Sequence, residues 1–148
     1  MLELFASGVD LYIATRSKAL MPESVLGMGI RVHQDRRTVT VYVPTATAAA
    51  TLRNLEDNGQ VAATLSCPPD HRTIQLKGRC TRVRESAAPD REIQEIFRSA
   101  LVGSLAAIGT PRALTRALPW WPSTAVDFEV EGVFTQTPGP HAGEPLHG

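Results

Sequence analysis

The 148-residue sequence lacks an excess of charge of either sign. Lysine and arginine total 15, aspartate and glutamate also total 15, and the net charge is zero. Proteins that neutralise nucleic-acid phosphates carry a basic excess, so we expect no nucleic-acid partner. No apolar run approaches the ~18 residues that a membrane helix needs. The N-terminus carries Glu3 and no secretory-type stretch, which predicts a cytoplasmic protein without a membrane partner.

Cysteine is scarce, because Cys67 and Cys80 are the only two and form no CxxC pair. Without a secretory segment we expect both thiols to be reduced and buried. Cys67 and His71 are too few ligands for a zinc site, so we expect no metal. The motifs GxGxxG, GxxxxGK[ST], HExxH and GxSxG are also missing, which removes the usual signs of nucleotide, zinc-protease and serine-hydrolase sites. Catalytic residues therefore stay unassigned.

Apolar residues make up 43% of the sequence, enough for a single compact core. The valines at 39, 41 and 43 alternate as in a half-buried strand, which Pro44 ends because it has no N–H to donate. Five other segments show strand patterns: residues 11–15, 25–33, 61–66, 72–79 and 126–131. Short strands at close spacing favour a barrel over a parallel α/β sheet.

Residues 1–136 are expected to form this barrel domain. Residues 137–148 contain six prolines and glycines and predict an extended tail, draped over a partner or partly disordered.

Two or three helices are predicted within the barrel domain, the third being a short helix that starts at Thr110 and Pro111 and carries Leu114 and Leu118. The first covers residues 47–58, with Thr47 as its cap and Gly59 at a left-handed exit. The second begins near Pro89, which suits a first helical position. Its apolar face is expected to comprise Ile93, Ile96, Phe97, Ala100 and Leu101.

The entry to the first helix is the stretch that most suggests chemistry. Thr45, Thr47 and Thr51 flank backbone amides that a helix leaves free at its N-terminus, which makes a phosphate site possible. Capping and turn formation alone also explain these threonines.

Three further features each have two interpretations. Trp120 and Trp121 wall a flat ring, or they belong to the core or a subunit interface. Arg72 faces a ligand or lies on a solvated strand face. Gly27 and Gly29 mark close approach of a ligand, a subunit or another backbone, or else a bulge or barrel bend.

Several pieces in order resemble the FMN-binding split-barrel family, the pyridoxamine 5'-phosphate oxidase-like and general-stress-protein-like flavoproteins. The matching pieces are residues 11–15, 39–43, 51–58 with 61–63, 72–78 and 133–143. Together they cover most of the chain.

The resemblance implies a six-stranded split β-barrel, mainly β with helices, that forms a homodimer with FMN at the subunit interface. Tyr42 and Val43 match positions beside the flavin, and Thr73 falls where the family has a glutamine contact. Ala48 and Ala49 stand where the oxidase has two basic residues. That departure removes charge-assisted bonds to the flavin phosphate.

The leading hypothesis is thus an FMN-dependent oxidoreductase that uses an unknown small-molecule substrate or reductant. Its predicted cofactor-binding residues are Tyr42, Val43, Thr45, Thr47, Arg72, Thr73, Trp120 and Trp121. One alternative is a non-enzymatic barrel that holds haem or a deazaflavin, or that has lost its cofactor. Another is a dimeric interaction protein whose tail wraps its partner.

Overall fold

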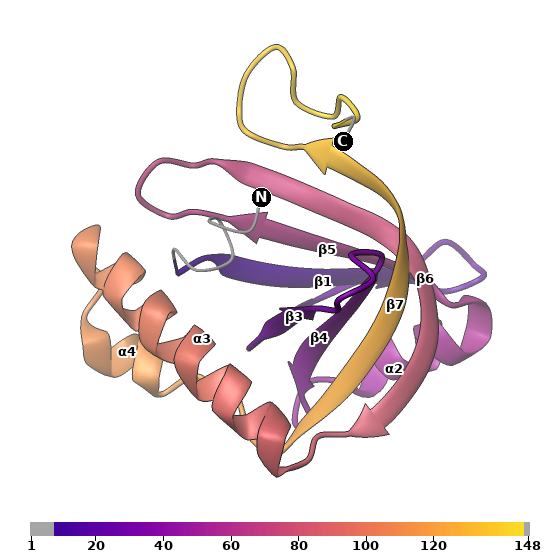
Figure 1. Cartoon of the computed structure of the whole chain (residues 1–148), viewed down its shortest axis with the longest axis horizontal. Coiled ribbons are helices and arrows are strands. Elements are labelled where there is room, and N and C mark those ends of the chain that lie inside the picture. The colour runs from indigo at the N-terminus through magenta and orange to yellow at the C-terminus, as the bar shows by residue number, and fades with distance from the viewer. Residues whose placement is uncertain (1–7, 147–148) are drawn as a thin grey trace.

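The computed structural model describes residues 8–146, which form one curved antiparallel sheet flanked by three helices (Figure 1). The strands are β1 (Asp10–Arg16), β2 (Pro22–Leu26), β3 (Ile30–Val32), β4 (Thr38–Pro44), β5 (Gln60–Ser66), β6 (Thr73–Glu85) and β7 (Ser123–Thr135). Their order across the sheet is β2-β1-β5-β6-β7-β4-β3. The prediction of a mainly β fold with helices is confirmed.

The two end strands of the sheet, β2 and β3, follow each other in the chain through Gly27, Met28 and Gly29. The Gly27 amide donates to the Leu11 carbonyl of β1 at 2.7 Å, and the Met28 amide donates to the Tyr42 carbonyl of β4 at 2.8 Å. This short segment therefore links both ends of the sheet. The single strand predicted here is divided in two, so the six-strand count is not confirmed: the described residues form seven strands.

Both glycines of this segment are explained by the close approach of side chains from the same chain. Gly29 has a φ of +154°, and a Cβ there would lie 2.9 Å from both Tyr42 Cδ2 and Gln94 Cγ. A Cβ on Gly27 would lie 2.8 Å from the Leu11 side chain. Of the interpretations open from the sequence, close approach therefore holds, and the approaching groups are side chains of the same chain.

Strand β4 is buried on both of its faces. Val39, Val41 and Val43 point into the core and are at most 3% exposed. Thr40 and Tyr42, on the other face, are no more than 1% exposed. The alternating pattern predicted one buried face. The other face, which carries Tyr42, is covered by residues such as Asp90, which binds the Tyr42 hydroxyl.

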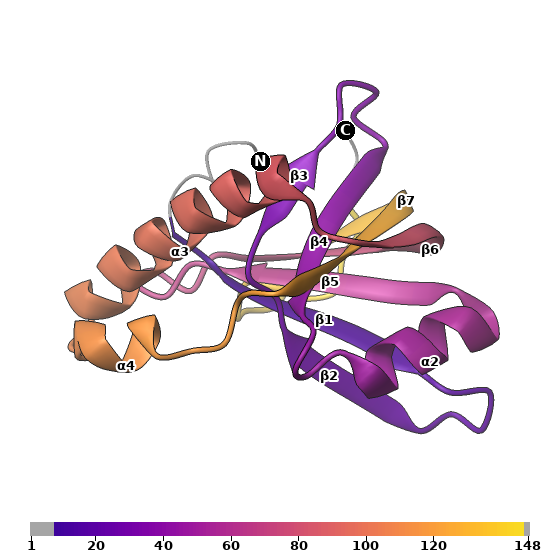
Figure 2. The ribbon, with the colours of Figure 1, turned by 90° about the horizontal axis from the view of Figure 1, so that it is seen from below.

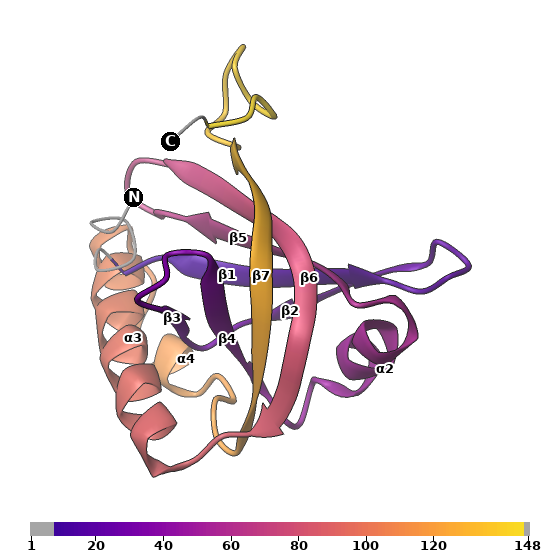
Figure 3. The same cartoon turned by 45° about the vertical axis from the view of Figure 1, so that its right-hand side comes forward.

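The helices are α2 (Ala49–Asn58), α3 (Ala88–Ala107) and α4 (Arg112–Arg116). Helices α3 and α4 lie on one side of the sheet and α2 lies on the opposite side (Figures 2 and 3). Gly59 ends α2 with a φ of +70°, and its amide donates to the Leu55 carbonyl at 2.8 Å. The predicted left-handed exit is confirmed.

The predicted cap of α2 is wrong. The N-cap residue is Ala48, and no side chain caps the helix. The Thr47 hydroxyl instead donates to the Pro44 carbonyl at 3.2 Å. A hydroxyl that is turned back into the preceding turn is not placed to accept from the first helical amides.

The buried face of α3 differs from the predicted stripe. Phe97 and Leu101 are buried as predicted, but Ile96 is 66% exposed. Asp90 and Gln94 take up the remaining contact positions and are at most 4% exposed. The helix is turned so that two polar side chains face the sheet. In residues 8–146, no helix is both long and apolar enough to cross a membrane.

Residues 137–146 turn back on the barrel through hydrogen bonds to β7 and to the start of β6, and the division into a barrel domain and a tail stays a prediction. The Leu146 amide donates to the Val133 carbonyl of β7 at 2.8 Å. The Thr137 hydroxyl accepts from the Thr73 amide at 3.0 Å. The tail thereby covers the end of β7 that β4 does not pair.

Candidate functional site

The entry to α2 lies against the segment that precedes β7. Pro44, the last residue of β4, pairs with Ser123, the first residue of β7. The Thr45 amide donates to the Pro122 carbonyl at 2.9 Å, while the Thr45 side chain is exposed. The structure therefore brings Thr45 beside the segment that carries Trp121, although the two are far apart in the sequence.

The first turn of α2 offers backbone donors to an anion. The amides of Ala49 and Ala50 have no hydrogen-bond partner among the described residues, as expected for a helix start without a side-chain cap. The partial positive charge of a helix N-terminus favours a phosphate there. Thr47 is exposed nearby. Ala48 is 1% exposed and belongs to the core, so this position, basic in the oxidase, serves packing here.

Tyr42 and Val43 are fully buried and are not exposed to a ligand at the surface. The Tyr42 hydroxyl donates to Asp90 Oδ1 at 2.8 Å, and Arg84 Nη2 donates to the same oxygen at 2.9 Å. The hydrogen bonds from Arg84 lower the pKa of Asp90, and burial raises the pKa of Tyr42. The Tyr42 hydroxyl therefore links β4 to α3 through a hydrogen bond and is not available to solvent.

Trp120 and Trp121 are half-buried, with ring centroids 6.2 Å apart and planes at 48°. The Arg91 guanidinium of α3 lies 5.5 Å from the Trp120 centroid and 5.6 Å from the Trp121 centroid. Cations placed over indole rings are attracted by the ring quadrupole, which helps to hold both rings in place. The rings are packed on the protein and still partly open to a ligand.

Arg72 and Thr73 already have partners within their own loop. Arg72 Nε donates to Asp70 Oδ2 at 2.7 Å. The Thr73 hydroxyl donates to the His71 carbonyl at 2.9 Å, and its amide is bound by Thr137 of the tail. Both residues lie at the start of β6, where Ile74 pairs with Thr135.

The predicted site residues thus fall into two groups at opposite ends of β7. Thr45 lies beside the Ser123 end and Thr73 lies beside the Thr135 end. A strand of 13 residues spans roughly 40 Å along its length at ~3.3 Å per residue. One copy of the chain does not bring both groups to the same small ligand.

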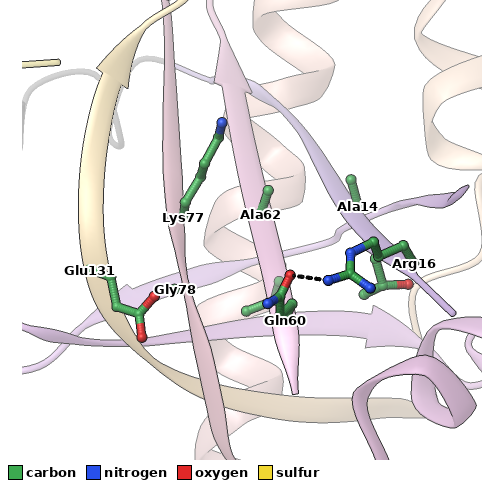
Figure 4. A pocket seen from close by; sticks show the side chains of 9 residues that line it. Ala14, Arg16, Gln60, Ala62, Lys77, Gly78 and Glu131 are labelled. Carbon is green, nitrogen blue, oxygen red and sulfur yellow. Dashed lines mark hydrogen bonds between the residues drawn. The ribbon is translucent and has the colours of Figure 1, made fainter. Parts of the chain in front are cut away.

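A further hollow of about 350 Å³ lies on the outer face of β1, β5 and β6 (Figure 4). Ala14 and Ala62 pair directly across β1 and β5, and their small side chains leave the space open. Arg16 and Lys77 bring positive charge, and Glu131 brings negative charge. None of the predicted site residues lines this hollow. The sequence alone did not reveal it, because Ala14 and Ala62 become neighbours only through the register of β1 and β5.

The fold is similar to that of several solved structures. An FMN-binding protein from Syntrophomonas wolfei aligns with a TM-score of 0.52 and 10% identity, over 90% of this chain and 86% of that chain. A Clostridium acetobutylicum protein related to general stress protein 26, of the pyridoxinephosphate oxidase family, gives 0.51 and 15%, over 90% and 83%. HutZ, the haem storage protein of Vibrio cholerae, gives 0.53 and 15%, over 90% of each chain. This chain shares their fold.

The resemblance predicted from the sequence is confirmed at the level of the fold. No protein-family model and no curated protein sequence matches the chain. At 10 to 15% identity to these structures, the likeness establishes the fold alone. The identity of the ligand is therefore inferred from the residues of the site.

Proposed function

We propose that the protein binds FMN and acts, as a homodimer, as a flavin-dependent oxidoreductase on a small molecule. The observation that carries this proposal is the first turn of α2, where two amides lack partners beside Thr45, Thr47 and the segment of Trp121. The fold shared with an FMN-binding protein from Syntrophomonas wolfei supports the choice of ligand.

In this proposal the flavin phosphate lies at the start of α2. The amides of Ala49 and Ala50 and the hydroxyl of Thr45 donate to its oxygens, and the Thr47 hydroxyl does so after it turns away from the Pro44 carbonyl. No basic side chain takes part, so the helix N-terminus supplies the positive potential. The affinity is expected to be lower than that of a site with charge-assisted bonds, which are roughly twice as strong as neutral ones.

The remaining predicted residues frame the ring system. Trp120 and Trp121 provide an aromatic wall, and the buried Tyr42 and Val43 keep β4 rigid beneath it. Bound FMN supplies the redox chemistry, and the chain supplies position and electrostatics.

Arg72 and Thr73 reach the same ligand only from a second copy, because they lie at the other end of β7. In the proposed homodimer, each FMN is therefore held by the α2 entry of one copy and by the start of β6 of its partner. The tail, which binds the Thr73 amide, is then adjacent to the interface.

The test is the visible absorption spectrum of the purified protein, repeated after FMN is added and the sample is desalted. We expect a flavin spectrum that stays with the protein. It should be lost in the double variant Thr45→Ala, Thr47→Ala and kept in Thr110→Ala, a control distant from α2 in the sequence. A wild-type protein that releases all FMN on desalting would contradict the proposal.

A non-enzymatic haem-binding barrel is the second candidate. The observation that favours it is the core packing of Ala48, which leaves the phosphate site without a basic side chain, together with the likeness to HutZ, a haem storage protein. Titration with haemin discriminates the two. A Soret band that shows one haem per chain, in a protein that does not bind FMN, would favour the haem-binding barrel.

A further inference from the structure

A second hollow, apart from the α2 entry, lies between α3 and α4, which run side by side (Figure 2). Its volume is about 260 Å³. It is lined by Arg98, Ser99 and Val102 of α3 and by Arg112 and Arg116 of α4. Three of these five side chains are cationic and none is acidic, so the hollow has a positive potential.

The three arginines have no carboxylate partner among the described residues, whereas five of the ten other arginines of the chain do. Among the described residues, five arginines form ion pairs with aspartate or glutamate: Arg37, Arg72, Arg79, Arg84 and Arg91. Within residues 8–146, no carboxylate lies within ion-pair distance of Arg98, Arg112 or Arg116. Three like charges around one hollow repel each other unless an anion lies between them.

Arg98 is held in place at the wall of the hollow. Its Nη2 donates to the Arg116 carbonyl at 2.8 Å, and its guanidinium carbon lies 4.8 Å from the Trp120 ring centroid. Its Nε is buried and has no acceptor in the part of the chain that the structure describes. A buried N–H without an acceptor is rare in native proteins, so part of the Arg98 guanidinium has no partner among the described residues.

We propose that this hollow binds the phosphate group of a small phosphorylated molecule. Guanidinium groups match phosphate oxygens with their planar, paired donors. Their three positive charges exceed the two negative charges of a phosphate dianion, and the Ser99 hydroxyl adds one neutral donor. A carboxylate carries only one charge and two oxygens and would leave more of the arginine donors unpaired.

The site would be formed by one copy of the chain and does not depend on FMN. Trp120 contacts Arg98, so its fluorescence is expected to report the arrival of an anion in the hollow.

The test is calorimetric titration of the full-length protein with inorganic phosphate, with ionic strength held constant by sodium chloride. In the Thr45→Ala, Thr47→Ala background, which weakens the proposed phosphate site at α2, we expect one phosphate per chain and a change in tryptophan fluorescence that saturates with it. Arg112→Gln and Arg116→Gln should each weaken binding by about tenfold, since a hydrogen bond to a charged group contributes that much or more. Arg53→Gln, the same change on an exposed residue of α2, should leave the affinity unaltered.

Three outcomes would overturn the proposal. One is the absence of binding at millimolar phosphate, and another is equal affinity in Arg112→Gln and in Arg53→Gln. The third is a loss of FMN retention in Arg112→Gln in parallel with the loss of phosphate binding, which would assign the arginines to the flavin site. Unfolding midpoints equal to that of the wild type would show that the variants are folded.

Discussion

Asp90 is the charged residue on which the docking of α3 depends. Its side chain is only 4% exposed and accepts hydrogen bonds from Tyr42, from Arg84 and from the Ala87 amide. A carboxylate removed from water is tolerated only with such a set of donors. These hydrogen bonds tie the start of α3 to Tyr42 of β4 and Arg84 of β6.

Replacing Asp90→Asn should lower the free energy of unfolding by about 2–4 kcal/mol, because Arg84 and Tyr42 lose a buried ionised partner. Urea denaturation followed by circular dichroism measures this change. Glu92→Gln, an exposed position on the same helix, serves as the control and should have almost no effect. A cost as small as that of the control would show that the network adds little to stability.

The same carboxylate makes part of the stability depend on pH. Because the folded-state pKa of Asp90 is lowered, its contribution is complete above the unfolded pKa of about 3.9 and is lost as the pH falls toward the folded value. The stability difference between wild type and Asp90→Asn should be constant near neutral pH and shrink below about pH 4. A difference that grows in acid would have the wrong sign for this explanation.

Substitution of Thr47 tests ligand binding without disturbing a helix cap, because Thr47 does not cap α2. Thr47→Ala should therefore cost less than the ~1 kcal/mol of a lost N-cap, while FMN retention falls. Thermal unfolding and FMN titration of one preparation measure both quantities. Unchanged FMN affinity would remove Thr47 from the phosphate site.

Among the structural elements, the Gly27–Gly29 link depends most closely on the identity of its residues. Gly29→Ala should destabilise the protein by about 1–3 kcal/mol, because the added Cβ meets Tyr42 and Gln94 and the backbone is left-handed. Gly103→Ala, with no atom within 4 Å of its Cβ inside α3, should instead be stabilising by roughly 0.5–1 kcal/mol. Chemical denaturation of the two variants tests both signs.

Local patterns in the sequence predicted the elements well where the cause is itself local. The alternating valines located β4, and Gly59 located the end of α2. The face of α3 could not be predicted, because the partner of Asp90 is Tyr42, 48 positions away. The fold of the tail depends on hydrogen bonds to Thr73 and Val133, which no pattern within residues 137–148 reveals.

The same distinction holds for the candidate sites. The threonines at the start of α2 were found because a strand followed by a helix places free amides beside them. The arginine hollow was missed, because Arg98 meets Arg112 and Arg116 only after α3 and α4 have packed together. Sequence reasoning identifies the residues of a site more readily when they are neighbours in the chain.

For the whole molecule, the separation of the flavin site into two groups has a testable consequence. Equal amounts of Thr45→Ala, Thr47→Ala protein and of Arg72→Gln, Thr73→Ala protein should each retain little FMN alone. Mixed dimers made by co-expression should recover up to one intact site of the two, because one site combines the unaltered α2 entry of one copy with the unaltered start of β6 of the other. Flavin absorbance per dimer, with light scattering for the mass, measures the recovery. No recovery in confirmed mixed dimers would show that the site lies within a single copy.

The folded tail also bears on how the protein resists self-association. Removal of residues 137–148 would leave the backbone of Val133 and Thr135 without partners on the edge of β7 that faces away from β6. An open strand edge is a template for another chain. We expect the C-terminal segment to keep this edge from pairing with another chain, so its removal should first appear as turbidity in concentrated samples.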